Sequence, residues 1–253
     1  MTFAVAADSY DRFMGRYSGP LAPVFADFAG VAEGQRVLDV GCGPGALTAE
    51  LVRRLGPDSV AAVDPSEPFV VAARERHPGV RVERASSEDL PFPDGAFDAA
   101  LAQLVVHFMT DPVAGLREMA RVSREDGVVA ACVWDHAPGG QGPLSVFWEA
   151  ARELDPGLED ESELAGALEG QLGELFDAAG LDDIDEGRIA VSVEHPSFEE
   201  WWEPFTLGVG PAGDHAAGLE PEQQAELRER SRQQLPEAPF TLSVRAWAAR
   251  GLA

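Results

Sequence analysis

The chain has 253 residues and a formal net charge of -25, and every one of its 19 basic residues is arginine. A field of this sign repels phosphate backbones and anionic lipid, so nucleic acids and membrane surfaces are disfavoured as partners and a small molecule is favoured. The sequence contains no run of about 18 apolar residues and no basic leader followed by an apolar core, so we expect a cytoplasmic protein.

From residue 36 onward, apolar β-branched runs alternate with amphipathic runs of about ten residues. Strands are predicted over residues 36–40, 59–63, 80–83, 98–104 and 127–134. Helices are predicted over residues 45–55, 68–76 and 112–122. Strands that alternate with such helices are typical of βαβ units and a parallel sheet. The length fits one large domain with insertions better than two independent domains.

After residue 134 the pattern changes. Helical spacing recurs at 145–155 and 170–180, strands are predicted at 188–194 and 239–251, and a mixed stretch at 197–235 ends in a polar helix. These segments predict a lid over the edge of the sheet, which is where substrate specificity often resides. The acidic run ELDPGLEDESEL at 153–164 is interpreted as a solvated face.

Residues 37–45 read VLDVGCGPG, a buried strand followed by glycines at every second position. Glycine tolerates positive φ and lets a backbone approach a ligand, so Gly41, Gly43 and Gly45 predict a binding loop. Asp64 ends the next strand, where a carboxylate can accept hydrogen bonds from both hydroxyls of a ribose. The alternative is a simple tight turn with Asp64 as a helix cap, but strand, loop, helix and acid in register favour a nucleoside site.

The spacing of the glycines distinguishes between nucleoside ligands. The dinucleotide fingerprint is GxGxxG, whereas this loop reads GxGxG, with Asp39 two residues before the first glycine. An aspartate beside glycine amides suits a ligand that carries an ammonium group better than one that carries a pyrophosphate. The loop therefore favours a ligand other than a nicotinamide dinucleotide.

The segment VLDVGCGPG, the acid in AAVDPSE and the run from SSEDLPFPDG to GVVAACVW resemble class I S-adenosylmethionine-dependent methyltransferases that act on small molecules. The resemblance covers residues 36–135, and terminal segments resemble uncharacterised bacterial members. It implies an α/β, Rossmann-like, seven-stranded, mostly parallel sheet flanked by helices, with the last strand antiparallel and a helical lid from C-terminal insertions. A single domain over 1–253 is expected, with an N-terminal helical segment at 1–35, the cofactor core at 36–135, and lid segments and the last two strands at 136–253.

The resemblance also assigns residues to the cofactor, S-adenosyl-L-methionine. The methionine part would contact Asp39, Gly41, Cys42, Gly43, Gly45 and Gln103, and the nucleoside part would contact Asp64, Pro65, Ser66, Ser86, Ser87 and Glu88. Ser86 stands where the family commonly has an acid that meets the adenine amino group, which is a departure from the pattern. Tyr10, Met14 and Tyr17 are expected to close over the cofactor from the N-terminal segment, with Tyr17 taken as the contact.

The five histidines differ in what their positions predict. His107 follows the fourth strand, close to where the family places the transferred methyl, and is the candidate base, with packing as the alternative. His136 could line the substrate cavity but is expected as a solvated or capping group. His77 is expected to end a helix, and His195 and His215 to lie at the surface. Ligand spacing for a metal is absent from the sequence.

The aromatic residues of the second half are expected mainly in the core. Trp201 and Trp202 cannot face the same way on a helix, so only one of them is a candidate for the substrate pocket. Cys42 and Cys132 lack CxxC or Cys/His spacing and are expected to be reduced thiols.

The expected function is methyl transfer to an oxygen, nitrogen or carbon atom of a small metabolite by a monomer or homodimer. One alternative is a non-catalytic protein that binds S-adenosylmethionine. A nicotinamide-dependent oxidoreductase is a weaker alternative, because the glycine spacing differs and a Tyr/Lys pair is impossible in a chain without lysine.

Overall fold

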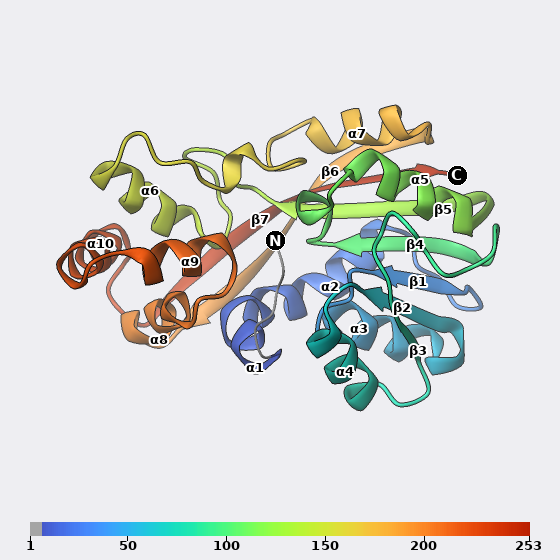
Figure 1. Ribbon diagram of the computed structural model, residues 1–253, viewed down its shortest axis with the longest axis horizontal. Helices are drawn as coiled ribbons and strands as arrows, with labels where there is room; N and C mark the ends of the chain where they lie inside the picture. Colours follow the sequence, from blue (N-terminus) through green and yellow to red (C-terminus); the bar gives the residue numbers. More distant parts are fainter. Residues whose placement is uncertain (1–6) are drawn as a thin grey trace.

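The computed structural model describes residues 7–253, which form a seven-stranded sheet with helices on both faces (Figure 1). The strands lie in the order β3-β2-β1-β4-β5-β7-β6. Their bounds are β1 (Val37–Val40), β2 (Val60–Asp64), β3 (Arg81–Arg84), β4 (Phe97–Gln103), β5 (Ser123–Trp134), β6 (Asp182–His195) and β7 (Phe240–Leu252). The predicted fold class is confirmed, including its antiparallel last strand.

Parallel pairing joins β3, β2, β1, β4 and β5, so the carboxyl ends of these five strands meet at one edge of the sheet. β7 is antiparallel to both of its neighbours, β5 and β6. Strands β1 and β2 are buried along their whole length, as expected of apolar strands covered on both faces. The parallel part places the glycine loop after β1 beside the acid that ends β2.

The helices pack on the two faces of the sheet and define two apolar cores. α2 (Arg16–Phe28), α3 (Ala46–Leu55) and α4 (Glu67–Arg76) contribute to one core, and α5 (Pro112–Val122) and α7 (Gln171–Ala179) contribute to the other. Before α2 lie α1 (Ala7–Tyr10) and a π-helical turn, η1 (Asp11–Gly15), in the segment expected to be helical. Short 3-10 turns are η2 (Pro57–Ser59), η3 (Val106–Phe108), η4 (Glu161–Glu163) and η5 (Glu203–Leu207).

The remaining helices form the lid, which comprises α6 (Ser145–Leu154), α8 (Phe198–Trp202), η5, α9 (Gly210–Gly218) and α10 (Pro221–Gln234). They gather at one end of the molecule, away from α3 and α4 (Figure 1). Beyond the Trp134↔Ala246 pair, β7 stays in register only with β6, as far as the His195↔Phe240 pair. This two-stranded extension, the β6–β7 ribbon, carries the chain from the sheet into the lid and back.

Most predicted elements agree with the structure to within one or two residues, but β5 and β6 begin four and six residues earlier than predicted. Most of the added residues are polar, and pairing of Ser123 with β4 and of Asp182 and Asp185 with β7, rather than an apolar pattern, extends the two strands. In residues 7–253 no helix is long and apolar enough to cross a membrane.

Candidate cofactor and acceptor site

The glycine loop lies at the carboxyl edge of the sheet, between β1 and α3. Gly41 has a φ of +70°, and a Cβ added there would lie 2.4 Å from the Val105 side chain, so only glycine fits. Gly43 has a φ of +54°, and a Cβ there would meet no atom within 4 Å, because it would project into open space. The loop therefore presents a bare backbone to a cavity.

The Asp64 carboxylate is fixed by backbone amides on both sides. Oδ2 accepts from the Gly43 N–H at 2.8 Å, and Oδ1 accepts from the Ser66 N–H at 2.8 Å. Burial raises the pKa of this carboxyl, while the two amide hydrogen bonds oppose the shift. These bonds join the loop after β1 to the turn after β2, and the remaining lone pairs can serve a ligand.

The main cavity lies against this loop and has a volume of about 230 Å³. It is lined by Tyr10, Gly41, Gly43, Asp64, Pro65, Ser66, Phe69, Ala85, Ser86, Ser87, Glu88, Leu104, Val105, Phe108, Met109 and Thr110. Polar groups from the turn after β2 stand opposite apolar side chains that follow β4. A cavity with this mixture suits a nucleoside, which has an apolar ring and a polar sugar.

A narrower cavity of about 40 Å³ continues past Gly41 toward the ends of β1 and β4. Asp39 lies there, 1% exposed, with Thr48 Oγ1 donating to its Oδ2 at 2.6 Å. Burial raises the pKa of Asp39 to about 7. Gln103 Nε2 donates to the Ser18 carbonyl at 3.1 Å, while Gln103 Oε1 is buried without a hydrogen-bond partner.

A carboxyl and an unpaired amide oxygen together would fit a ligand's ammonium group. The residues present are thus suitable for the amino acid part of S-adenosylmethionine, as Asp64 is for its ribose. This fit depends on tertiary contacts as well as on the loop sequence, because Gln103 and Ser18 come from β4 and α2.

Most of the predicted cofactor contacts line one of these two cavities. Asp39, Gly41, Cys42, Gly43 and Gln103 line the narrow one, and Asp64, Pro65, Ser66, Ser86, Ser87 and Glu88 line the main one. Glu88 also accepts hydrogen bonds from the Thr110 and Asp111 amides at 2.8 and 3.3 Å. Its carboxylate therefore holds the segment after η3 against the cavity.

Two predicted contacts lie elsewhere. Gly45 precedes α3 with a φ of +102°, and its carbonyl oxygen lies 3.1 Å from His77 Nε2, outside both cavities. Tyr17 points away from the cavities, with its hydroxyl 3.1 Å from His195 Nε2. Tyr10, seven residues earlier in the N-terminal segment, lines both cavities, whereas Tyr17 lines neither.

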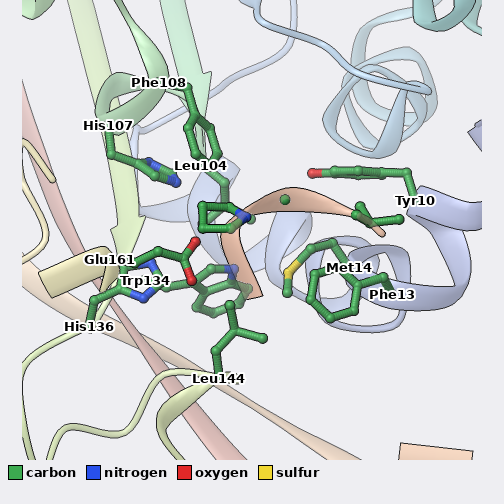
Figure 2. Close-up of a pocket in the computed structure, with 13 residues that line it drawn as sticks. Tyr10, Phe13, Met14, Leu104, His107, Phe108, Trp134, His136, Leu144 and Glu161 are labelled. Carbon is green, nitrogen blue, oxygen red and sulfur yellow. The ribbon is translucent and has the colours of Figure 1, made fainter. Parts of the chain in front are cut away.

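A third cavity, here called the acceptor cavity, lies between the sheet edge and the lid and has a volume of about 30 Å³ (Figure 2). Tyr10, Leu104 and Phe108 line it as well as the main cavity, so the two adjoin. Its other walls are Phe13, Met14, His107, Trp134, His136, Leu144, Glu161, Val209, Gly210 and Pro211. The predicted lid thus forms part of the wall of this cavity.

The two histidines and the one carboxylate that line the acceptor cavity are buried. His107 and His136 are each 7% exposed, and their ring centroids are 5.8 Å apart. Burial lowers the pKa of His107 well below its ordinary value and that of His136 to about 4, so both rings are neutral at pH 7. The expectation that His136 is a solvated or capping group is wrong, because it is buried against the cavity.

Glu161 was not singled out by the sequence. It belongs to the acidic run interpreted as a solvated face, yet it is 4% exposed and its Oε2 accepts from Trp148 Nε1 at 2.7 Å. Burial raises the pKa of Glu161 to about 7. No pattern along the chain distinguishes it from its solvated neighbours.

The other histidines are structural. His77 caps the end of α4, as predicted, and His215 packs against Phe147 and Trp148. His195 was expected at the surface but is fully buried, since β6 carries it into the junction between α2 and the lid. In residues 7–253 no three His, Cys, Asp or Glu side chains are grouped to hold a metal ion.

Trp201 and Trp202 are buried with Phe147 and Phe205 in the aromatic core of the lid, and neither lines the three cavities. Trp134 alone among the tryptophans contributes to the acceptor cavity as the described residues define it. The expectation that most aromatic residues serve the core is confirmed.

The family model of a methyltransferase domain matches residues 38–131. Over these residues the chain is similar to methyltransferase domains. Over 100 residues the chain is 38% identical to 2-methyl-6-phytyl-1,4-hydroquinone methyltransferase 2, chloroplastic, of Oryza sativa subsp. japonica. The match covers 39% of this chain and 28% of that protein.

Solved structures share the methyltransferase fold beyond the domain core. YcgJ from Bacillus subtilis superposes with a TM-score of 0.58 at 20% identity, covering 91% of this chain and 97% of that one. The [4+2]-cyclase SpnF superposes with a TM-score of 0.57 at 22% identity, and the match covers 92% of this chain and 80% of the SpnF chain. The chain spans less than two thirds of the length of the curated relatives it matches, so their activities do not transfer to it directly.

Proposed function

We propose that this protein transfers a methyl group from S-adenosyl-L-methionine to a small-molecule acceptor and releases S-adenosylhomocysteine. The observation that carries the proposal is the junction of the main cavity, held by Asp64 and the glycine loop, with a lid-covered acceptor cavity. A cytoplasmic location and a monomeric or homodimeric state accompany the proposal.

Each part of the cavities has a proposed role toward the cofactor. Asp64 would accept hydrogen bonds from the ribose hydroxyls, and Asp39 with Gln103 would accept from the ammonium group. Gly41 and Gly43 would allow close backbone approach, and Pro65 and Ser66 would flank the adenine. Ser86 stands where the family commonly has an acid, and its neutral hydroxyl is a weaker acceptor than a carboxylate, which would weaken adenine recognition.

The bound cofactor supplies a methyl group already activated by a sulfonium, so the protein mainly has to hold a nucleophile in line with it. The predicted role of His107 as a base is modified by its burial, because an imidazole whose pKa is well below its ordinary value is a weak proton acceptor. We propose instead that His107 orients the nucleophile by accepting a hydrogen bond from it.

Two other functions fit parts of the site. A non-catalytic cofactor-binding protein would have the same main cavity but would not need the adjoining acceptor cavity. The likeness to the [4+2]-cyclase SpnF is below 25% identity and concerns the fold alone, and a fold hosts more than one chemistry. The nicotinamide alternative is less favoured because the loop has GxGxG spacing and an aspartate faces the narrow cavity.

Calorimetric titration with S-adenosylhomocysteine, with NADH as the control, tests the proposal. We expect S-adenosylhomocysteine to bind with micromolar affinity and NADH not to bind. When an acceptor is supplied, the protein should convert S-adenosylmethionine to S-adenosylhomocysteine. Binding of NADH alone would overturn the cofactor assignment. Cofactor binding without turnover over a broad panel of metabolites would favour the non-catalytic alternative.

A further inference from the structure

The acceptor cavity has an electrostatic character that narrows the class of acceptor. Its volume of about 30 Å³ admits two or three water-sized groups, since one water needs roughly 10–15 Å³ by this measure. It can therefore hold the reacting head of an acceptor, while the rest of the acceptor extends among the lid residues. The polar groups around the head decide what it can be.

Glu161 is the one acidic side chain that lines this cavity in the described part of the chain. Trp148 donates to its Oε2, and the carboxylate makes no other hydrogen bond within residues 7–253. Two arginines pair with the acids that precede Glu161 and His136 in the chain, Arg152 with Asp160 and Arg245 with Asp135. Glu161 therefore lies in an apolar enclosure without a counter-ion from any residue that lines the cavity.

The two histidines add hydrogen-bonding capacity but no charge. His107 Nδ1 and His136 Nε2 are buried without hydrogen-bond partners. Buried polar groups are nearly always paired in folded proteins, so the unpaired nitrogen on each ring is available to a group bound in the cavity. As neutral imidazoles, both rings can accept a hydrogen bond through one nitrogen.

Aromatic faces complete the enclosure. Trp134, Phe108, Phe13 and Tyr10 line the same cavity, and aromatic rings attract cations through their negative faces. No arginine lines the cavity in residues 7–253. Glu161 is the one charged side chain that a carboxylate or phosphate group would meet among the described residues that line the cavity, so an anionic head is disfavoured.

We infer that the acceptor is an amine, bound as an ammonium head between Glu161, His107 and His136, with Glu161 as its counter-ion and proton acceptor. The inference rests on the proposed methyl transfer and specifies its substrate class. Figure 2 shows the Glu161 carboxylate and the His107 ring from different elements directed toward the same cavity.

The step balances with one proton acceptor. A proton passes from the ammonium nitrogen to the Glu161 carboxylate, which frees the nitrogen lone pair. That pair forms the new nitrogen–carbon bond with the transferred methyl, while the carbon–sulfur bond breaks and its electrons stay on sulfur. The products are the protonated N-methylamine and S-adenosylhomocysteine, and the proton on Glu161 leaves to solvent when the lid opens.

Matched probes test the inference. Phenethylamine, tryptamine and butylamine, each with the alcohol and carboxylate of the same skeleton, are titrated calorimetrically at pH 8 with and without saturating S-adenosylhomocysteine. We expect at least one amine to bind at least tenfold more tightly than both of its matched analogues. In a separate reaction with S-adenosylmethionine, the N-methylated product of that amine should form in a one-to-one ratio with S-adenosylhomocysteine.

Variants at neighbouring positions supply the controls. Glu161→Gln keeps the acceptor for Trp148 but removes the charge, so the preference for the amine should fall at least tenfold with S-adenosylhomocysteine affinity unchanged. Glu163→Gln alters an exposed residue of the same turn, η4, and should leave both unchanged. Glu161→Asp keeps the negative charge and should therefore retain more of the preference for the amine than Glu161→Gln does.

The outcomes separate the two proposals. Absence of S-adenosylhomocysteine binding to the wild-type protein would overturn the proposed function. Normal S-adenosylhomocysteine binding with no amine preferred over its alcohol and carboxylate, or with a preference that Glu161→Gln leaves intact, would overturn the amine inference alone.

Discussion

Asp64 shows how one side chain can prepare a binding site before a ligand arrives. Its two oxygens are already held by the amides of Gly43 and Ser66, so the carboxylate cannot rotate away from the main cavity. The same contacts fix the glycine loop relative to β2. A ligand that uses the remaining lone pairs meets a rigid acceptor, and rigid acceptors cost little ordering entropy on binding.

We predict that Asp64→Ala weakens S-adenosylhomocysteine binding by about 2 to 4 kcal/mol, because paired charge-assisted hydrogen bonds to the ribose are lost. Calorimetric titration measures the change, and thermal melting checks that the fold persists. Asp58→Ala, at an exposed position in η2, is the control and should bind normally. Equal affinities for the two variants would refute the ribose assignment.

Glu161 should also make stability depend on pH. Its pKa in the folded protein is about 7, above the ordinary 4.5, so the folded state holds a proton that the unfolded state releases. The resulting stabilisation is complete below pH 4.5 and is lost as the pH rises through 7. Glu161→Gln has no carboxyl to titrate, so its free energy of unfolding does not fall in this way. Relative to the wild type it should rise by up to roughly 3 kcal/mol between pH 4.5 and pH 8.

Denaturant unfolding at pH 5 and pH 8 measures the difference. Glu163→Gln is the matched control, since that residue is exposed in the same turn, and its difference from the wild type should not change with pH. If the free energies of unfolding of Glu161→Gln and the wild type differ by the same amount at pH 5 and pH 8, the pKa of Glu161 is not raised in the folded protein.

At the scale of elements, the β6–β7 ribbon joins the lid to the sheet and to α2. His195, the last residue of β6, lies between Tyr17 on α2 and Glu200 on α8, at 3.1 Å and 2.9 Å respectively. Arg16 closes the cluster through an ion pair with Glu200 at 2.6 Å. The N-terminal segment and the junction of β6 with α8 therefore share one partly buried polar cluster, and Tyr17 belongs to it.

This junction predicts opposite outcomes for two tyrosines. Tyr17→Phe should destabilise the protein by about 1–3 kcal/mol, because it leaves a buried histidine nitrogen unpaired, without changing S-adenosylhomocysteine affinity. Tyr10→Ala should weaken that affinity with a smaller effect on stability, because Tyr10 lines all three cavities. Denaturant unfolding measures the stability of both variants, and calorimetry measures their affinity for S-adenosylhomocysteine. Loss of affinity in Tyr17→Phe with normal affinity in Tyr10→Ala would support the original prediction that Tyr17 contacts the cofactor.

At the scale of the whole molecule, a net charge of -25 opposes compaction. Arginine ion pairs with acidic partners occur across the surface, but exposed pairs contribute only about 0–1 kcal/mol each. Repulsion among the excess carboxylates should outweigh what these pairs supply. The molecule is therefore expected to be more stable when its charges are screened.

We predict that the melting temperature rises as NaCl is increased from about 0.05 to 1 M, because the Debye length falls from more than 10 Å to about 3 Å. Scanning calorimetry with NaCl compared against equal osmolarity of sucrose separates charge screening from general solute exclusion. A melting temperature that falls with NaCl would show that ion pairs, rather than repulsion, dominate the surface electrostatics.

The sequence by itself determined the parallel core, the glycine loop and Asp64, because each depends on residues close together in the chain. Apolar runs specify strands, alternate glycines specify the loop, and an acid at a strand end lies at the carboxyl edge whatever the rest of the chain does. Only the tertiary structure decided the roles of Tyr10, Tyr17, Glu161 and His195. Their burial depends on partners far along the chain, such as Tyr17 with His195, or on folding back of a lid loop, such as Glu161 onto Trp148. Burial of a polar residue is set by what packs over it, and no local pattern encodes that.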